Sequence, residues 1–428
     1  MRPAPLATLL ALCLVQGCAS RGQTQNITLR VSNWGGAGNG GDFDRMVQGF
    51  YRQFELDNPG VTVSVETVPE AYPSKMMLDY VAGAMPDVMT VDASSAAVFV
   101  DNGILEDLRP YIAQERNHPD QYRFSLDNFY KSAVDIDRRA DRIYAIPGDF
   151  TPMVLYYNKD LFDRAHVPYP KPGWTFADFQ RTARLLTVPG KQYGFFFKNW
   201  MPGWIMWLWN GGGDVLSKDN HAEGVFDSPQ NVKTVTFLRG LVSQGLAPAL
   251  SQQEAQGQDL FAAGKCAMTI SGHWSLIDYK NPPKDAQGNP DIDWQHLGVV
   301  ELPHDAPNSQ TVMYEAGLAI PTQAKHKQLA WKFIKAWTSY QWQMKYQSSG
   351  IAVCARKDVA EQRATTPIEK EFLGLIPQAR PPYGSFVQGY DAVETLGTAA
   401  MDSILNDNVP VAQSLKSAAY RIDREFAK

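Results

Sequence analysis

The sequence predicts an α/β protein whose chain forms two lobes and crosses between them more than once. Its 428 residues are more than one hydrophobic core usually organises. Before residue 103 the pattern of strands and helices is βαβαβ, which is typical of parallel strands with ligands at their carboxyl ends. Residues 144–162 predict a strand, a bend at Pro147 and Gly148, a second apolar strand and the start of a helix. We interpret this stretch as the first crossing, with Asp149 exposed beside it.

The elements before this crossing each have a local signal. Residues 25–32 alternate apolar and polar side chains, which predicts a strand, and Asp42 is placed to cap a helix with one apolar face. Asn58, Pro59 and Gly60 end that helix. The further expected elements are a strand at 61–65, a helix at 74–82, a strand at 86–92 and a short helix that ends at 103.

The elements after the crossing follow in the same way. Thr175 and Asp178 have the spacing of a capping box at the start of a helix. We expect a strand at 193–197, helices at 200–210 and 229–244, a strand within 261–274 and a surface loop at 281–293. A second crossing is expected at 314–321, a helix at 327–339, a third crossing at 350–356 and mainly helices beyond it.

The N-terminus has the features of an export signal. Arg2 precedes an apolar run at 6–15 that is too short to span a membrane. The sequence Leu14-Val15-Gln16-Gly17-Cys18 resembles a bacterial lipobox, so residues 1–17 would be removed and Cys18 lipidated, with 18–26 as a tether. The alternative is an ordinary signal peptide cleaved nearby. Both interpretations export the mature protein.

Composition and the absence of known motifs disfavour several classes of function. The net charge is −5 and no basic block occurs, so nucleic-acid binding has no electrostatic footprint. GxSxG, HExxH and CxxC motifs are absent, and the seven His are scattered, which leaves no predicted metal site. His273 is expected to be a polar loop residue. Export permits a disulfide between Cys266 and Cys354, but two buried free thiols are equally open.

The glycine-rich loop at 36–41 matches GxGxxG and precedes a helix, and Glu66 ends the next strand at about the spacing of a dinucleotide site. Free nicotinamide cofactors are scarce outside the cell, the leader lacks a twin-arginine signal, and Trp34 stands where close backbone approach is needed. We therefore expect no cofactor. The loop is interpreted as a ligand-contacting loop, with simple surface flexibility as the alternative.

Aromatic residues provide the positive signal for function. Trp200, Trp204 and Trp207 lie on one face of the helix expected at 200–210, and Trp274 follows a glycine-bearing loop. Core packing is the expected role of Trp207 and Trp209. Sugar rings have apolar faces that stack on indole, while their hydroxyls need polar partners. Anionic ligands would require clustered Arg or Lys, which these loops lack.

A family resemblance rests on motifs that occur in order along nearly all of the mature chain. They are PDVMTVDASSAAVFVDNGILEDL, YNKDLF, GWTFADF, GKCAMTISGHW and GLAIPTQAKHKQLAWKFIKAW. Together they resemble the extracellular solute-binding proteins of sugar ABC importers, the maltose-binding-protein class. The resemblance implies a two-lobed periplasmic-binding-protein fold, type II-like, with three crossings in its hinge. Lobe 1 is expected at 27–146 plus 316–347, and lobe 2 at 148–313 plus 350–428.

The family's contact positions carry over to this sequence one by one. Ser94 and Ser95 stand where the maltose binder has an Asp-Arg pair, which disfavours maltose itself but leaves other neutral sugars open. The late aromatic contact falls on Tyr383 or Tyr390. The expected ligand-binding residues are Asn33, Trp34, Gly35, Asp92, Ser94, Ser95, Asp149, Trp200, Trp204, Trp274, Tyr314, Glu315 and Tyr383.

The resemblance implies a monomer that captures a neutral mono- or oligosaccharide by hinge closure and delivers it to a membrane permease, without chemistry on the ligand. A glycerophosphodiester or polyol is the alternative ligand within this class. An exported carbohydrate-active enzyme is an alternative from another class, because Asp92, Asp149 and Glu315 lie near the expected cleft and paired carboxylates hydrolyse glycosides. A surface lipoprotein that binds a protein partner is a third.

Overall fold

The computed structural model describes residues 26–35, 42–115, 120–250, 259–284, 287–350, 352–407 and 409–427. The predicted lipidation site Cys18 and the glycine-rich loop at 36–41 lie outside these residues. No helix among the described residues has both the length and the apolar character needed to cross a membrane.

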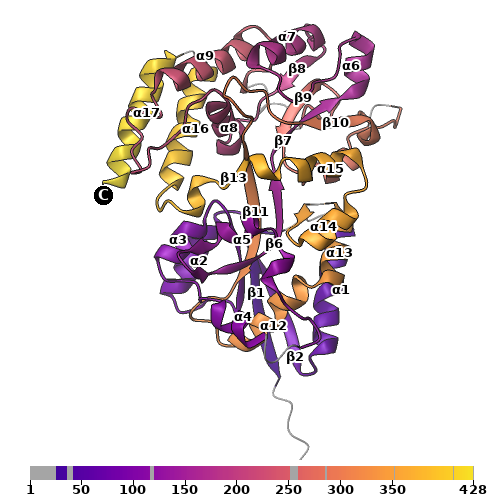
Figure 1. The fold of residues 1–428 in the computed structure, drawn as a ribbon, viewed down its shortest axis with the longest axis vertical. Coiled ribbons are helices and arrows are strands. Elements are labelled where there is room, and N and C mark those ends of the chain that lie inside the picture. Colours follow the sequence, from indigo (N-terminus) through magenta and orange to yellow (C-terminus); the bar gives the residue numbers. More distant parts are fainter. Residues whose placement is uncertain are drawn as a thin grey trace, which may run out of the picture.

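The larger sheet organises the lower half of the molecule in Figure 1. Its strands follow the order β12-β6-β11-β3-β1-β2, and β13 joins at β11. As predicted, β1 pairs in parallel with both β2 and β3, so their carboxyl ends meet at one edge. The three strands are β1 (Ile27–Asn33), β2 (Val61–Thr67) and β3 (Val88–Asp92).

Helices pack on this sheet, and aromatic side chains form the core between them. Phe50 of α1 (Asp42–Asp57) packs edge-on against Phe333 of α12 (Lys327–Trp337), Trp337 and Trp342 of α13 (Tyr340–Ser349), with ring centroids 4.9–5.1 Å apart. Edge-to-face contacts of this kind stabilise a core beyond area burial. The other elements of this half are α2 (Tyr72–Val81), α3 (Ala96–Asp101), α4 (Arg109–Glu115), η1 (Leu126–Asn128), α5 (Lys131–Ile136), β4 (Arg138–Arg139) and β5 (Arg142–Ile143).

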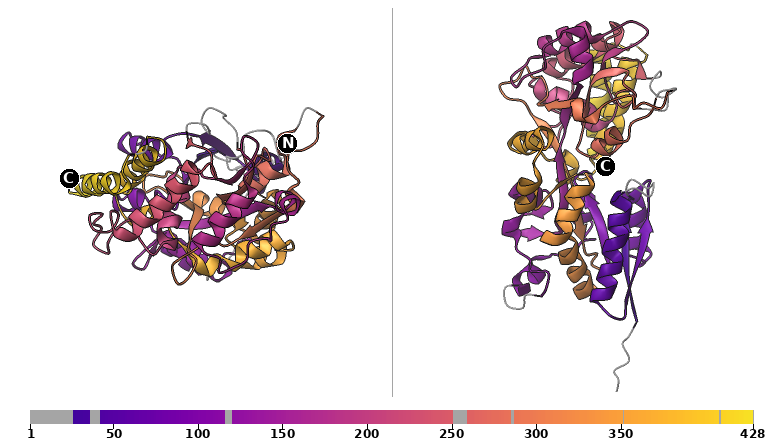
Figure 2. Two further views of the ribbon diagram at one scale, coloured as in Figure 1. Left: turned by 90° about the horizontal axis from the view of Figure 1, so that it is seen from above. Right: turned by 90° about the vertical axis from the view of Figure 1, so that its right-hand side faces the viewer.

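The smaller sheet organises the other half and has the order β10-β7-β9-β8. The views in Figure 2 show the C-terminal helices on this half, away from the N-terminal strands. The strands are β7 (Val154–Asn158), β8 (Tyr193–Phe196), β9 (Cys266–Ser271) and β10 (Leu297–Val300). The helices are α6 (Lys159–Ala165), α7 (Phe176–Leu186), α8 (Met201–Asn210), α9 (Pro229–Ser243), α11 (Ser275–Lys280), η2 (Trp294–His296), α16 (Asp391–Leu405) and α17 (Val411–Phe426).

The first crossing differs from the prediction. No bend occurs at Pro147 and Gly148, because β6 (Ala145–Pro152) runs through both residues. A β-bulge accommodates these two residues in the strand. Ala316 pairs with Asp149 and Gly317 pairs with Pro147, so Gly148 has no partner in the register. The chain leaves the strand only after β6, where β7 begins. The partner strand β11 (Thr311–Ala319) forms the second crossing, so two long paired strands join the halves.

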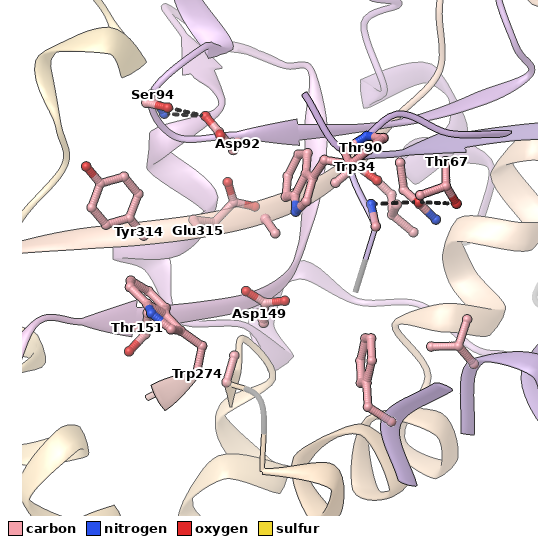
Figure 3. A pocket seen from close by; sticks show the side chains of 18 of the residues that line it. Trp34, Thr67, Thr90, Asp92, Ser94, Asp149, Thr151, Trp274, Tyr314 and Glu315 are labelled. Atoms are coloured by element: carbon pink, nitrogen blue, oxygen red, sulfur yellow. Dashed lines mark hydrogen bonds between the residues drawn. The ribbon is translucent and has the colours of Figure 1, made fainter. Parts of the chain in front are cut away.

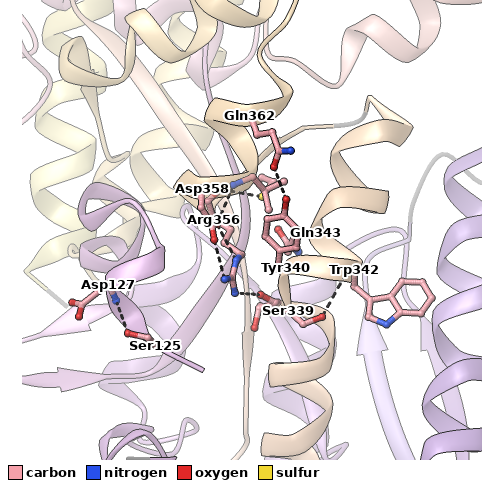
Figure 4. A network of polar contacts seen from close by, with 12 residues as sticks. Ser125, Asp127, Ser339, Tyr340, Trp342, Gln343, Arg356, Asp358 and Gln362 are labelled. Atoms are coloured by element: carbon pink, nitrogen blue, oxygen red, sulfur yellow. Dashed lines mark hydrogen bonds and ion pairs between the residues drawn. The ribbon is translucent and has the colours of Figure 1, made fainter. Parts of the chain in front are cut away.

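The third crossing contains β12 (Val353–Cys354), which pairs with β6. Arg356 beside it is buried and forms two contacts with Asp358 (Figure 4). Its third contact is with the carbonyl of Thr338 in the larger-sheet half, 3.4 Å away. The chain then continues through α14 (Lys357–Arg363), α15 (Pro367–Gly374), η3 (Ile376–Gln378), β13 (Ala379–Arg380) and η4 (Tyr383–Ser385).

The structure decides two local predictions. The capping box of Thr175 and Asp178 is confirmed, with both reciprocal hydrogen bonds present at the start of α7. Cys266 and Cys354 are buried free thiols, so the disulfide alternative is not formed.

Candidate ligand-binding cleft

A cleft of about 1370 Å³ lies where the two halves meet. It is larger than the usual range of about 300–1,000 Å³ for small-molecule pockets. The larger-sheet half contributes the ends of β1 and β3 and part of α1, and the other half contributes the start of α8 and one face of α16. Strands β6 and β11, which join the halves, also line the cleft. Figure 3 shows side chains from the ends of β1 and β3, from β6 and β11, and Trp274 around one space.

The side chain of Asn33 fixes the turn after β1. Its Oδ1 accepts hydrogen bonds from the Gly35 amide at 3.0 Å and from the Thr67 hydroxyl at 3.3 Å. Gly35 has φ of +100°, a conformation that favours glycine, and a Cβ there would lie 3.1 Å from Thr67 Cγ2. Trp34 packs edge-on against Tyr72 at 5.6 Å. The turn therefore presents the Trp34 ring to the cleft.

The turn after β3 is organised by a carboxylate. Asp92 Oδ1 accepts hydrogen bonds from the Ser94 amide and hydroxyl at 2.7 and 2.6 Å and from the Ser95 amide at 2.9 Å. Because one oxygen holds the whole turn, Asp92 and Ser94 keep fixed positions at the edge of the cleft.

Three aromatic rings form a wall on the other side. Trp200, just before α8, lies nearly parallel to Tyr314 of β11, with centroids 6.3 Å apart. Trp274 contacts both rings edge-on at 6.3 and 6.2 Å. We call Trp200, Trp274 and Tyr314 the aromatic wall. It offers apolar ring surface beside polar groups, an arrangement that suits the apolar face of a sugar ring.

Carboxyl groups in and behind the cleft have raised pKa values. Burial raises the pKa of Asp149 to about 7, and the Tyr346 hydroxyl, which donates to Asp149, opposes the shift. Burial, with nearby Asp92 and Asp391 adding to it, raises the pKa of Glu394 to about 7. Glu315 is 2% exposed, and burial together with the neighbouring carboxyl of Asp137 raises its pKa well above the ordinary range.

Comparison with known proteins identifies the family. A model of the bacterial extracellular solute-binding proteins matches residues 37–344. The chain belongs to this family. Solute-binding proteins of this family are extracellular, so the protein is exported to the cell envelope, as the leader predicts.

Two curated relatives cover most of this solute-binding protein. A putative binding protein of Brucella abortus is 24% identical over 387 residues, which are 88% of this chain and 89% of the relative. The sn-glycerol-3-phosphate-binding periplasmic protein of Escherichia coli K12 is 23% identical over 313 residues, which are 69% of this chain and 66% of the relative.

Solved structures show the same fold. An ABC substrate-binding protein from Listeria monocytogenes in complex with cycloalternan superposes with a TM-score of 0.79 at 21% identity, covering 94% of this chain and 98% of that one. The sugar-binding protein MalE of Xanthomonas citri superposes with a TM-score of 0.74 at 20% identity, with the same coverage. The predicted two-lobed fold of the maltose-binding-protein class is confirmed.

Most predicted contact positions of this solute-binding protein line the cleft. Their spacing in the sequence is large, yet the ends of β1, β3 and α8 and the middle of β6 and β11 bring them together. Asp149, expected to be exposed, is half-buried at the centre of the cleft because β6 continues through its position. The predicted residues that line the cleft are Asn33, Trp34, Gly35, Asp92, Ser94, Asp149, Trp200, Trp274, Tyr314 and Glu315.

The other three predicted positions lie elsewhere. Trp204 is fully buried in the core and donates to the Thr398 hydroxyl, because α8 turns that face inward. Ser95 is buried in the Asp92 turn. Tyr383 is buried and donates to Asp214 outside the cleft lining. His273, expected to be a polar loop residue, is buried against Phe372.

One face of the cleft, formed by α16, was not predicted from the sequence. Glu394, Thr395, Thr398 and Asp402 of α16 line it at the spacing of a single helix face, and Asn199 donates to Asp402 at 2.5 Å. The polar stripe on this otherwise apolar helix was the available signal. Other cleft residues that were not predicted include Phe43, Asp44, Tyr51, Thr67, Thr90, Thr151, Trp337 and Tyr346.

Proposed function

We propose that this protein is the substrate-binding component of a carbohydrate ABC importer. The observation that carries the proposal is the aromatic wall, which faces hydroxyl and carboxylate acceptors across one cleft. Aromatic faces bind the apolar side of a sugar ring, and carboxylates accept hydrogen bonds from its hydroxyls. A sugar between Trp34 and Asp92 on one side and the aromatic wall on the other would contact both halves.

Closure around the ligand is the mechanism that this arrangement supports. The moving bodies would be residues 27–146 with 316–347 and residues 148–313 with 350–428. They meet at the paired strands β6 and β11, where the bulge at Gly148 interrupts the ladder. Because a bound sugar would contact both bodies, it would favour the closed form, which a membrane permease would then recognise.

A glycerol phosphate ligand, suggested by the name of the Escherichia coli relative, has less support. Phosphate sites in proteins use Arg, Lys or clustered backbone amides. Among the described residues, no Lys, Arg or His lines the cleft.

Trp274 provides a direct test of the carbohydrate proposal. A form that begins after Cys18 is titrated calorimetrically with mono-, di- and oligosaccharides, polyols and glycerophosphodiesters. Trp274→Ala should weaken sugar binding by about tenfold or more through loss of ring stacking. Trp294→Ala is the matched control, because Trp294 is also half-buried but lies outside the cleft lining. An equal response of both variants would contradict binding at the aromatic wall.

The same titration separates a binder from an enzyme. Chromatography of the ligand afterwards should recover it intact, since the proposed role needs no chemistry on the solute. Recovery of cleaved sugar would replace the transport role by hydrolysis. The binding unit is proposed to be a monomer, which light scattering checks.

The proposed attachment is a lipid on Cys18, at the outer face of the cell membrane or in the periplasm. Wild-type protein should incorporate labelled fatty acid and sediment with membranes. Cys18→Ala should do neither, and incorporation by that variant would exclude Cys18 as the lipidated residue.

A further inference from the structure

The cleft is strongly acidic, and its acidic groups are not neutralised by the protein. Within the described part of the chain, its lining contains no basic side chain, and Asp92, Asp149, Glu315, Glu394 and Asp402 form no ion pair. A neutral sugar needs hydrogen-bond partners, but it does not need this many carboxyl groups without a basic partner. The concentration of carboxyl groups therefore requires a separate explanation.

Glu315 is the group that most clearly lacks a partner. Its side chain lines the cleft although it is 98% buried, and no donor among the described residues hydrogen-bonds to its carboxyl oxygens, which neighbour the carboxyl of Asp137. The charged groups that act on Glu315 are Asp137, Asp149 and Asp92, all of the same sign. Behind the cleft, Arg139 acts on Asp137, but it donates to the carbonyls of Ile136 and Arg138.

Figure 3 shows how these groups are arranged. The carboxyl groups of Glu315 and Asp149 lie in the middle of the view with Asp92 above them, Tyr314 and Trp274 to one side and Trp34 to the other. Aromatic faces attract cations, and buried carboxylates need a compensating positive charge. Among the described residues, no group of three or more His, Cys, Asp or Glu side chains converges as a metal site. The arrangement therefore suits an organic cation.

We propose that the solute is an amino sugar or an oligosaccharide that contains one, with its ammonium group placed before Glu315 between Asp149 and Asp92. The ring would stack on the aromatic wall, and its hydroxyls would reach Ser94 and the polar face of α16. This assignment rests on the proposed carbohydrate-binding function and specifies its ligand class.

Ammonium binding would also change the protonation of the cleft. Burial raises the pKa of Asp137 to about 7, and burial with the neighbouring carboxyls raises the pKa of Glu315 well above its ordinary range. A cation before Glu315 favours its charged form, so binding should release protons. The apparent binding heat of an amino sugar should then change with the ionisation heat of the buffer, whereas the heat of a neutral sugar should change little.

The test compares matched sugars on the wild-type form that begins after Cys18. The pair is the β-1,4-linked glucosamine disaccharide and cellobiose, titrated at pH 6.5 in two buffers of different ionisation heat. The aminated sugar should bind about tenfold tighter or more, because hydrogen bonds to charged groups are the stronger ones. Glu315→Gln should remove this preference for the aminated sugar, and its circular dichroism spectrum checks that the variant is folded.

The outcomes distinguish failure of the amino-sugar assignment from failure of the carbohydrate-binding function. Equal or tighter binding of cellobiose overturns the amino-sugar assignment and leaves the carbohydrate function standing. Absence of binding by every amino and neutral sugar overturns both. Glycerophosphocholine is the third arm, and a response to it alone also overturns the amino-sugar assignment, because the recognised cation would then belong to a phosphodiester.

Discussion

Asp149 should make the protein less stable as the pH rises above 5. Its carboxyl has a pKa of about 7 in the folded protein, whereas an unfolded Asp titrates near 3.9. Between these two values the folded protein holds more protons than the unfolded chain, so the free energy of unfolding falls with increasing pH. Asp149→Asn removes this contribution. The amide oxygen can still accept the Tyr346 hydroxyl, so the local hydrogen bond is kept.

The size of the effect follows from the shift. One pKa unit corresponds to about 1.4 kcal/mol, and integration of the two titrations between pH 5 and pH 8 gives about 2–3 kcal/mol. This value is an upper limit, because water in the cleft solvates a half-buried carboxylate. Urea unfolding at pH 5 and pH 8, without ligand, measures the difference between wild type and variant.

Asp219→Asn is the control, since Asp219 lies exposed on the surface. Glu394, Glu315 and Asp137 add their own pH dependence to the stability. The comparison therefore uses the difference in unfolding free energy between wild type and variant at each pH. Wild type and Asp149→Asn curves that shift in parallel between pH 5 and pH 8 would refute the reasoning.

Three further predictions concern the folded framework. In the form that begins after Cys18, Cys266 and Cys354 should not react with a thiol reagent in the folded protein, because burial raises the pKa of both thiols. Both should react in urea. Rapid reaction of the native protein would contradict their burial. Gly384→Ala should lower stability by about 1–3 kcal/mol, because the new Cβ would lie 1.9 Å from the Ser94 carbonyl oxygen, and an unchanged urea midpoint would show that this contact relaxes freely. Thr175→Ala should cost about 1 kcal/mol by removing the N-cap of α7, which thermal unfolding measures against wild type.

The sequence predicted the elements whose signal is local. The apolar alternation of residues 25–32 became β1, and the spacing of Thr175 and Asp178 became a complete capping box. The parallel arrangement of β1, β2 and β3 followed from their order, because parallel strands need crossover connections. For the same reason, Asn33 and Asp92 at the ends of β1 and β3 line one cleft.

The errors occurred where tertiary pairing decides the structure. Pro147 and Gly148 predicted a bend, but β11 supplies a partner whose bulge accommodates the extra residue. Trp204 has the same periodicity as Trp200, yet packing against α16 buries the former and leaves the latter at the cleft. The polar face of α16 was missed because no sequence motif shows that a C-terminal helix returns to the site.

The central claim is that this solute-binding protein captures a sugar-like solute in the cleft between its halves. The most direct measurement is a calorimetric titration of the form that begins after Cys18 with the amino and neutral sugars, followed by chromatography of the recovered ligand. The account predicts saturable one-to-one binding, loss of affinity in Trp274→Ala and recovery of intact sugar. Absence of binding by every sugar, or recovery of a cleaved product, would contradict it.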